Sequence, residues 1–204
     1  MLAGYCADHT IPLIHISTDF VFDGKQSQPY QPDDACAPLG IYGLSKRQGE
    51  QQALALCSSA TIIRTGWLYS ARGNNFVKTM LRCAAEGKTL NVVDDQVGTP
   101  TYALHLAAAI WQLLVKQAHG IFHFSDAGLA SWYDFAAAIF EEAHALGLLS
   151  ELPVVNPVSS DNYPTAAARP SYSVLDKTKI WALEGIEPCH WREGLRKMLK
   201  ELTL

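Results

Sequence analysis

The 204-residue sequence lacks several features that would place it in a special class of protein. It has no apolar run of about 18 residues, the length that suggests a membrane-spanning helix. Residues 1–9 lack the basic start and apolar stretch of a signal peptide. No run of lysines and arginines supplies the phosphate contacts that nucleic-acid binding needs, and the formal net charge is −4. We therefore expect neither a membrane nor a nucleic acid among its partners.

The sequence also lacks the paired cysteines of a disulfide-stabilised protein. Its five cysteines are odd in number and widely spaced, at Cys6, Cys36, Cys57, Cys83 and Cys189. This pattern fits reduced thiols in a cytoplasm better than a disulfide framework, so we expect a cytoplasmic protein. His119 and His123 are four residues apart, but Gly120 between them disfavours a helical metal-binding face. We expect no metal site.

The sequence does contain what an ordinary globular domain needs. Hydrophobic residues make up 49% of the chain and charged residues 18%, which indicates one domain, or one domain with a lobe. Apolar runs typical of buried strands lie at 11–16, 61–63, 89–93 and 120–124. Patterns typical of helices lie at 1–8, 39–57, 74–86, 101–117, 132–147 and 191–202, and the proline-containing stretch 152–169 is expected to be irregular. Alternating strands and helices predict an α/β fold with a mainly parallel, doubly wound sheet.

The most informative stretch begins with the apolar run 11–16 and ends in the helical pattern after residue 39. The predicted strand delivers the hydroxyl of Thr18 to its carboxyl end, where open α/β sheets bind their ligands. Tyr42 and Lys46 are four residues apart, so they share one face of the following helix. A neighbouring ammonium favours the phenolate form of a tyrosine. Taken alone, such a pair is most often an exposed helix turn.

Five ordered blocks of sequence resemble the dTDP-4-dehydrorhamnose reductases, a family of extended short-chain dehydrogenase/reductases. The blocks are Ser17-Thr18-Asp19-Phe20-Val21-Phe22-Asp23-Gly24 with Tyr42-x-x-x-Lys46, Arg64-Thr65-Gly66-Trp67-Leu68-Tyr69, Asn74-Asn75-Phe76-Val77-Lys78-Thr79-Met80-Leu81-Arg82, Asp94-Asp95-Gln96-Val97-Gly98-Thr99-Pro100-Thr101, and Tyr163-Pro164-Thr165 with Arg169-Pro170 and Ser173-x-Leu175-Asp176. They follow the family's order over nearly the whole chain. The resemblance implies a partial Rossmann-like sheet with a smaller, interleaved substrate lobe.

The resemblance also implies a reaction and its catalytic residues. The 4-keto group of dTDP-4-dehydro-6-deoxy-L-mannose (dTDP-4-dehydrorhamnose) would be reduced to dTDP-L-rhamnose by hydride from NADPH or NADH. Tyr42 would donate the proton to the developing alkoxide as a general acid. Lys46 would hold the nicotinamide ribose and tune Tyr42, and Thr18 would hydrogen-bond the carbonyl oxygen.

Further site residues follow from the same resemblance. Ser17, Tyr42, Lys46 and Gly66 are expected to contact the cofactor, and Thr18, Asp19, Phe20, Trp67, Asn75 and Arg169 the nucleotide-sugar substrate. The guanidinium of Arg169 could bind a diphosphate through two parallel hydrogen bonds. The alternative is a solvent-exposed arginine. Asp19 is also explained as a turn residue that ends the strand, and Trp67 as a core tryptophan. Trp132, Tyr133 and Phe135 are interpreted as core residues.

Phe20 distinguishes between reactions within the superfamily. Related sugar-nucleotide dehydratases follow the threonine with Asp-Glu, because elimination of water needs an acid and a base. Phe20 stands at the glutamate position and cannot exchange protons, which favours simple reduction. Two alternatives stay open: another nucleotide-sugar epimerase or ketoreductase, and a non-catalytic regulatory or binding subunit such as that of methionine adenosyltransferase.

The sequence departs from the family in one large respect. The Gly-x-x-Gly-x-x-Gly turn that holds a dinucleotide pyrophosphate is not found, because Gly40 and Gly43 are followed in register by Lys46. The expectation is a C-terminal portion without the pyrophosphate-binding part. Residues 1–70 and 89–118 would form a truncated Rossmann-like domain, and 71–88 and 119–204 the substrate lobe. The strand at 11–16 would then have a bare edge, which favours a homodimer.

Overall fold

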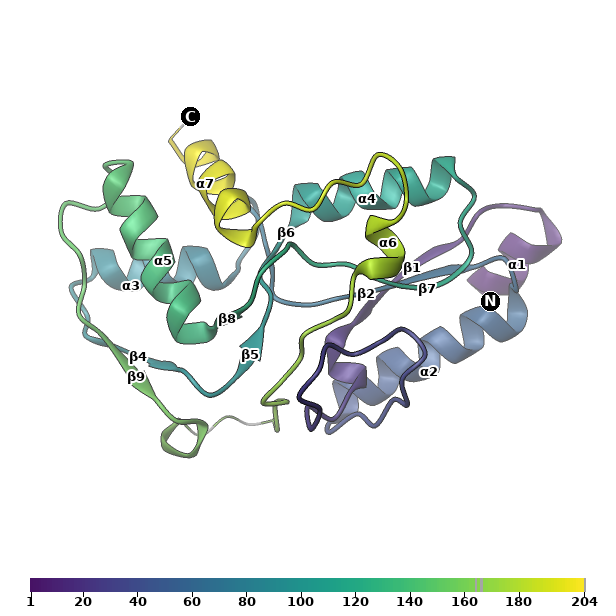
Figure 1. Cartoon of the computed structure of the whole chain (residues 1–204), viewed down its shortest axis with the longest axis horizontal. Helices are drawn as coiled ribbons and strands as arrows, with labels where there is room; N and C mark the ends of the chain where they lie inside the picture. Colours follow the sequence, from purple (N-terminus) through teal and green to yellow (C-terminus); the bar gives the residue numbers. More distant parts are fainter. Residues whose placement is uncertain (164, 166, 204) are drawn as a thin grey trace.

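The computed structural model describes residues 1–163, 165 and 167–203 of the chain. Its first part contains a parallel sheet of three strands, here called the main sheet, in the order β1 (Ile14–Thr18), β2 (Thr61–Thr65) and β7 (Gly120–His123). The strands run side by side in the right half of Figure 1. This arrangement confirms the α/β fold with a mainly parallel sheet that the sequence predicts.

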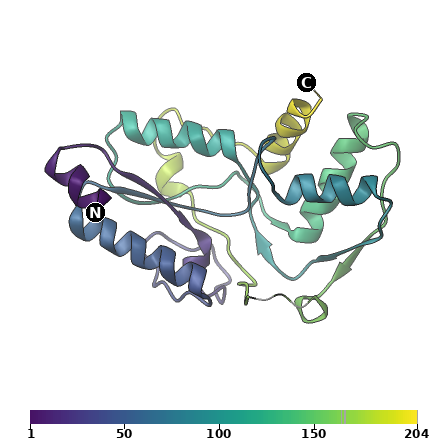
Figure 2. The ribbon, with the colours of Figure 1, turned by 180° about the vertical axis from the view of Figure 1, so that it is seen from behind.

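Helices cover both faces of the main sheet because its central strand is apolar on both sides. Ile62 packs toward α1 (Leu2–Asp8) and α2 (Ile41–Leu56), whereas Ile63 packs toward α4 (Ala103–Val115) and α6 (Thr178–Trp181). Successive residues of a strand point to opposite faces, so two adjacent isoleucines serve two cores. Figures 1 and 2 show α2 and α4 on opposite sides of the strands.

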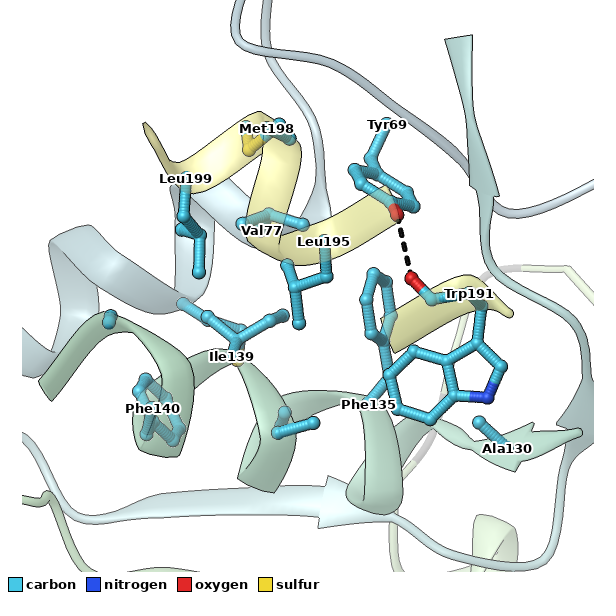
Figure 3. Packing of buried hydrophobic residues seen from close by; sticks show 14 of the residues in the cluster. Tyr69, Val77, Ala130, Phe135, Ile139, Phe140, Trp191, Leu195, Met198 and Leu199 are labelled. Atoms are coloured by element: carbon cyan, nitrogen blue, oxygen red, sulfur yellow. Dashed lines mark hydrogen bonds between the residues drawn. The ribbon is translucent and has the colours of Figure 1, made fainter. Parts of the chain in front are cut away.

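Three other helices pack around one apolar cluster and form the second part of the molecule. These are α3 (Phe76–Ala85), α5 (Trp132–Ala145) and α7 (Trp191–Glu201). Phe135, Ile139 and Ala143 of α5 are buried as their spacing predicts. Figure 3 shows Leu195, Met198 and Leu199 of α7 among the side chains of this cluster. The Ser131 cap predicted for α5 is confirmed as a capping box with Asp134.

One prediction about the strands was wrong. The stretch expected to be irregular contains β9 (Val155–Val158), which pairs in parallel with β4 (Leu90–Val93) in a separate two-stranded sheet. Pro157 lies in β9, and proline is tolerated there because β9 has a single partner strand. Strand pairing joins 90–93 to β9 and 120–123 to β2 of the main sheet. The domain boundaries expected from the sequence stay a prediction.

The buried face of α4 also differs from the expected one. The sequence places Leu104, Ala108, Trp111, Leu114 and Val115 at helical spacing. In the structure Leu104, Trp111 and Val115 are exposed, and Leu106, Ala109 and Leu113 are buried. The helix has no charged residue on any side, so hydrophobic periodicity does not identify its inner face.

Short strand pairs connect the two parts of the chain. β3 (Leu68–Tyr69) pairs in parallel with β6 (Thr101–Tyr102), and β5 (Val97–Gly98) pairs antiparallel with β8 (Ala130–Ser131). One-turn 3-10 helices lie at Asp19–Val21 and Ser160–Asn162. Among the described residues, no helix is both long and apolar enough to cross a membrane.

Candidate active site

The carboxyl end of the main sheet gathers hydroxyl groups that have few protein partners. β1 and β2 end together, with Thr18 opposite Thr65 and Ser17 opposite Arg64. Ser17 Oγ and Thr65 Oγ1 are buried and have no hydrogen-bond partner within the described part of the chain. Buried polar atoms without partners are rare in proteins. This end of the sheet therefore has unused hydrogen-bonding capacity for a polar ligand.

Thr18 already makes two hydrogen bonds through its hydroxyl group. Thr18 Oγ1 donates to Asp19 Oδ1 at 3.0 Å and accepts from the Phe20 amide at 3.2 Å. The second bond caps the 3-10 helix Asp19–Val21. The threonine is thus held in a single orientation by the residues that follow it.

Asp19 is buried at this strand end, with 3% of its surface exposed. Its carboxylate lies against Gly66, where an added Cβ atom would come within 2.5 Å of the Asp19 Cγ atom. Only glycine allows this approach of β2 to the end of β1. Burial raises the pKa of Asp19 to about 6, and hydrogen bonds from the hydroxyls of Ser173 and Thr18 oppose that rise.

Asp19→Asn is expected to change how the free energy of unfolding depends on pH. A carboxyl whose pKa is raised on folding binds more protons in the folded state, so stability is lost as pH rises from about 4 to about 6. A rise from 3.8 to about 6 corresponds to a loss on the order of 3 kcal/mol. The variant does not titrate, so denaturant unfolding at pH 4 and pH 8 should show it gaining about this amount relative to the parent.

Asp95→Asn is the matched control for this pH dependence. Asp95 is exposed, and a hydrogen bond from Ser160 holds the pKa of its carboxyl below the usual range. Removing the Asp95 carboxyl should change the pH dependence of the free energy of unfolding only slightly, and in the direction opposite to that of Asp19→Asn. Parallel pH profiles for Asp19→Asn and the parent protein would contradict the raised pKa.

Tyr42 and Lys46 lie on the first turns of α2, next to the end of β1. The Tyr42 side chain is 58% exposed, and its ring meets the Phe20 ring edge to face at 6.1 Å. Lys46 Nζ donates to the carbonyl oxygen of Ile16, which directs the ammonium to β1. Gly43 allows this close packing, because a Cβ atom there would lie 2.1 Å from the Phe20 carbonyl oxygen.

A buried ion pair fixes the same helix to β2. Arg64 donates to both carboxylate oxygens of Glu50, each at 2.9 Å, and to the Pro32 carbonyl at 3.0 Å. Arg64 Nη1 lies 3.4 Å from His123 Nε2, and His123 Nδ1 lies 3.0 Å from the Tyr30 carbonyl oxygen. Burial and the Arg64 charge lower the pKa of His123 to about 3, so His123 is neutral and accepts from Arg64.

Two cavities adjoin these residues and share Arg169. One, of about 230 Å³, is lined by Tyr42, Phe20 and Arg169 among others. The other, of about 240 Å³, is lined by Arg169 together with Phe76, Thr79, Met80, Asn91, Val92, Val93, Gln96, Trp132, Tyr163 and Thr165. A guanidinium that borders both cavities suits an anionic group such as a diphosphate.

A larger cavity of about 310 Å³ lies elsewhere, between α1 and the amino ends of β1 and β2. Its lining includes Cys6, Leu13, Leu113 and His119. Open parallel sheets bind ligands at the carboxyl ends of their strands. We therefore place the candidate site at the Thr18 end despite the greater size of this cavity.

Trp67 is held in an unusual conformation just after β2. Its φ angle is +50°, in the left-handed region that non-glycine residues seldom adopt. The Trp67 ring stacks on Trp132 with centroids 3.6 Å apart and planes at 4°. Gly98 makes room for it, since a Cβ atom there would lie 2.5 Å from Trp67 Nε1. Conformations of this kind concentrate at functional sites.

Trp132 and Gln96 line the second cavity, although neither is among the site residues predicted from the sequence. Trp132 packs against the apolar cluster, as interpreted from the sequence, and its partly buried ring also stacks on Trp67 and lines the cavity. Gln96 is buried and donates to Ser160 at 2.8 Å. The position of Trp132 at the start of a helix gave no signal, because aromatic residues at such positions are common in cores.

The side chain of Asn75 makes its hydrogen bonds close by in the sequence. Its side chain accepts from the Lys78 amide at 3.2 Å and donates to the Ser70 carbonyl at 2.7 Å. Both bonds serve the start of α3, and Asn75 does not line either cavity. Its contact with substrate stays a prediction. Pro164, part of a quoted motif, lies outside the described residues.

The residues at the end of β1 fit the ribose and nicotinamide end of a dinucleotide. Lys46 supplies an ammonium, Tyr42 an exposed phenol, and Ser17 Oγ a buried oxygen without a partner. Within the described residues no group of three or more His, Cys, Asp and Glu side chains is arranged to bind a metal ion.

The family described as RmlD substrate binding domain matches residues 1–204. The dTDP-4-dehydrorhamnose reductase of Aggregatibacter actinomycetemcomitans is 43% identical over 97% of this chain and 69% of its own length. The Escherichia coli enzyme of the same name is 42% identical over 93% of this chain and 65% of its own. The solved dTDP-4-dehydrorhamnose reductase from Bacillus anthracis, in complex with NADP, has a TM-score of 0.91 and 38% identity, and the match covers 98% of this chain and 69% of that one.

These similarities confirm the resemblance drawn from the five sequence blocks, and they extend over nearly all of the chain. The chain spans about two thirds of the length of these relatives. It belongs to the RmlD substrate binding domain family, together with dTDP-4-dehydrorhamnose reductases.

Proposed function

We propose that this chain provides the catalytic residues and the substrate lobe for reduction of dTDP-4-dehydrorhamnose to dTDP-L-rhamnose. The arrangement that carries the proposal is Tyr42 at a cavity shared with Arg169, beside the Thr18 strand end. Relatives with this reductase name at 42–43% identity support the substrate. Phe20 in place of a proton-exchanging residue supports reduction over elimination.

Each residue of the site has a distinct task in this proposal. A bound NADPH or NADH supplies the hydride. Tyr42 donates the proton to the oxygen of the sugar as it becomes an alkoxide. Lys46, with Ser17 and Gly66, contacts the nicotinamide ribose end of the cofactor, and Thr18 places the carbonyl oxygen. NADP in a solved relative supports a nicotinamide cofactor.

The two cavities divide the substrate between them. The aromatic cavity with Phe76 and Trp132 accepts the thymine base, and Arg169 accepts the diphosphate between the cavities. The Trp67 ring, partly exposed at the rim, packs against the sugar. Asp19 contributes to holding the sugar through its link to Thr18. We also propose a cytoplasmic location and a homodimer joined through the exposed edge of β1.

Turnover and binding measured separately test the proposal. Titration calorimetry should detect dTDP-L-rhamnose binding to the chain, and loss of NADPH absorbance should follow addition of dTDP-4-dehydrorhamnose. Nucleotide-sugar binding without cofactor binding would indicate that the substrate lobe is present but the chain is inactive alone. No binding of either ligand would contradict the proposed function, and turnover of other nucleotide sugars at equal rates would contradict the substrate.

A further inference from the structure

The hydroxyl of Thr18 has a limited number of hydrogen bonds to offer. A hydroxyl carries one proton and two lone pairs. The Phe20 amide takes one lone pair at 3.2 Å, and the proton goes to Asp19 Oδ1 at 3.0 Å. One lone pair is left. With Asp19 ionised, Thr18 can accept a hydrogen bond from a ligand but has no proton to donate.

This arrangement conflicts with the role of Thr18 toward a ketone. A ketone oxygen is only an acceptor, so it needs the Thr18 proton, and an ionised Asp19 also only accepts. The conflict disappears if Asp19 is protonated. Its own proton then goes to the second lone pair of Thr18, and the threonine proton is free for the ketone. An alcohol, in contrast, donates its proton to the lone pair that Thr18 keeps when Asp19 is ionised.

We propose that Asp19 is a positioning residue that carries a proton when the keto sugar is bound and none when the hydroxy sugar is bound, and so sets the direction of the Thr18 hydrogen bond. One proton enters Asp19 from solvent with the ketone and returns to solvent once the alcohol has formed. The proton that Tyr42 gives to the alkoxide is a different one. This inference rests on the proposed function and adds a proton balance to it.

The surroundings of Asp19 suit this exchange. Gly66 keeps the carboxylate in place, and Asp19 is buried with 3% of its surface exposed. The groups that act on Asp19 are the hydroxyls of Ser173 and Thr18 and the backbone amides of Asp19 and Phe20, and none of them is charged. Burial holds the pKa of Asp19 at about 6, where either state is readily reached near neutral pH.

Proton counting by titration calorimetry tests the inference without turnover. Binding of dTDP-4-dehydrorhamnose and of dTDP-L-rhamnose, both without NADPH, is measured between pH 6 and pH 7 in two buffers with different ionisation heats. The parent protein should take up more protons with the keto sugar than with the hydroxy sugar, with a difference approaching one proton. In Asp19→Asn that difference should disappear, although both ligands still bind.

Two substitutions at Thr18 separate this role from a merely structural one. Thr18→Val removes the hydroxyl and should abolish the difference in proton uptake while Asp19 still titrates. Thr18→Ser keeps the hydroxyl and should restore the difference. Equal proton uptake with both sugars in the parent protein, or an unchanged difference in Asp19→Asn, would overturn the inference alone. Failure of both sugars to bind the parent protein would overturn the proposed function and the inference with it.

Discussion

Replacing Tyr42 by phenylalanine is expected to lower the turnover rate by about 100- to 10,000-fold, the range that a positioned general acid contributes. The phenol is the exposed proton donor at the cavity that Phe20 and Arg169 also line. Phenylalanine keeps the ring and its edge-to-face contact with Phe20, so the packing is preserved. Steady-state rates of NADPH consumption, with binding of dTDP-L-rhamnose measured alongside, separate loss of the proton from loss of the site.

Tyr5→Phe is the matched control for this substitution. Tyr5 is 57% exposed, close to the 58% of Tyr42, but lies on α1 away from the carboxyl end of the main sheet. Its loss of a hydroxyl should leave turnover and binding unchanged. A Tyr42→Phe protein that turns over at the parent rate would show that another group donates the proton, and would remove Tyr42 from the mechanism.

Local signals in the sequence were sufficient for the six longer helices and for the three strands of the main sheet. Ser131 caps α5 and Asn75 caps α3. Each side chain accepts a hydrogen bond from the backbone amide three residues later, so each residue type indicates the start of a helix. Such signals act within one turn of chain. The inner faces of α5 and α7 were predicted correctly because each alternates apolar and polar sides.

The errors arose where structure depends on distant partners. Val155–Val158 has no alternating pattern and contains a proline, so it becomes a strand only because Leu90–Val93 lies beside it. The inner face of α4 is set by the neighbouring main sheet, since apolar residues also lie on its exposed side. Neither fact is encoded in the local sequence.

The site could be predicted only in part, because some of its residues are close in sequence and others are distant. Thr18, Asp19 and Tyr42 lie in one stretch of sequence, and a single strand and helix bring them together. The surroundings of Asp19 come from elsewhere, because Gly66 follows β2 and Ser173 lies near the end of the chain. The stack of Trp132 on Trp67 joins two different elements, so it could be recognised only in the folded structure.

Breaking the buried pair between Arg64 and Glu50 is expected to cost about 3–5 kcal/mol of stability. Arg64 and Glu50 are almost completely buried, and two hydrogen bonds of 2.9 Å join them. Arg64→Met leaves the Glu50 carboxylate buried with the Arg47 guanidinium at 3.0 Å as its remaining charged partner, and Glu50→Gln leaves the Arg64 charge without a counter-charge. Equilibrium unfolding in urea measures the loss for each variant.

The double variant Arg64→Met/Glu50→Gln distinguishes a lost attraction from an uncompensated charge. Removal of both charges leaves no unpaired ion in the buried pair, and Arg47, which loses Glu50, is partly exposed, so the double variant should be more stable than either single one. Glu184→Gln is the control, because Glu184 is exposed and lies 3.6 Å from Lys116; its effect should stay below about 1 kcal/mol. Strictly additive losses in the double variant would contradict a coupled pair. Since Glu50 and Tyr42 share α2, the single variants should also weaken turnover, through misplacement of the helix that carries the proton donor.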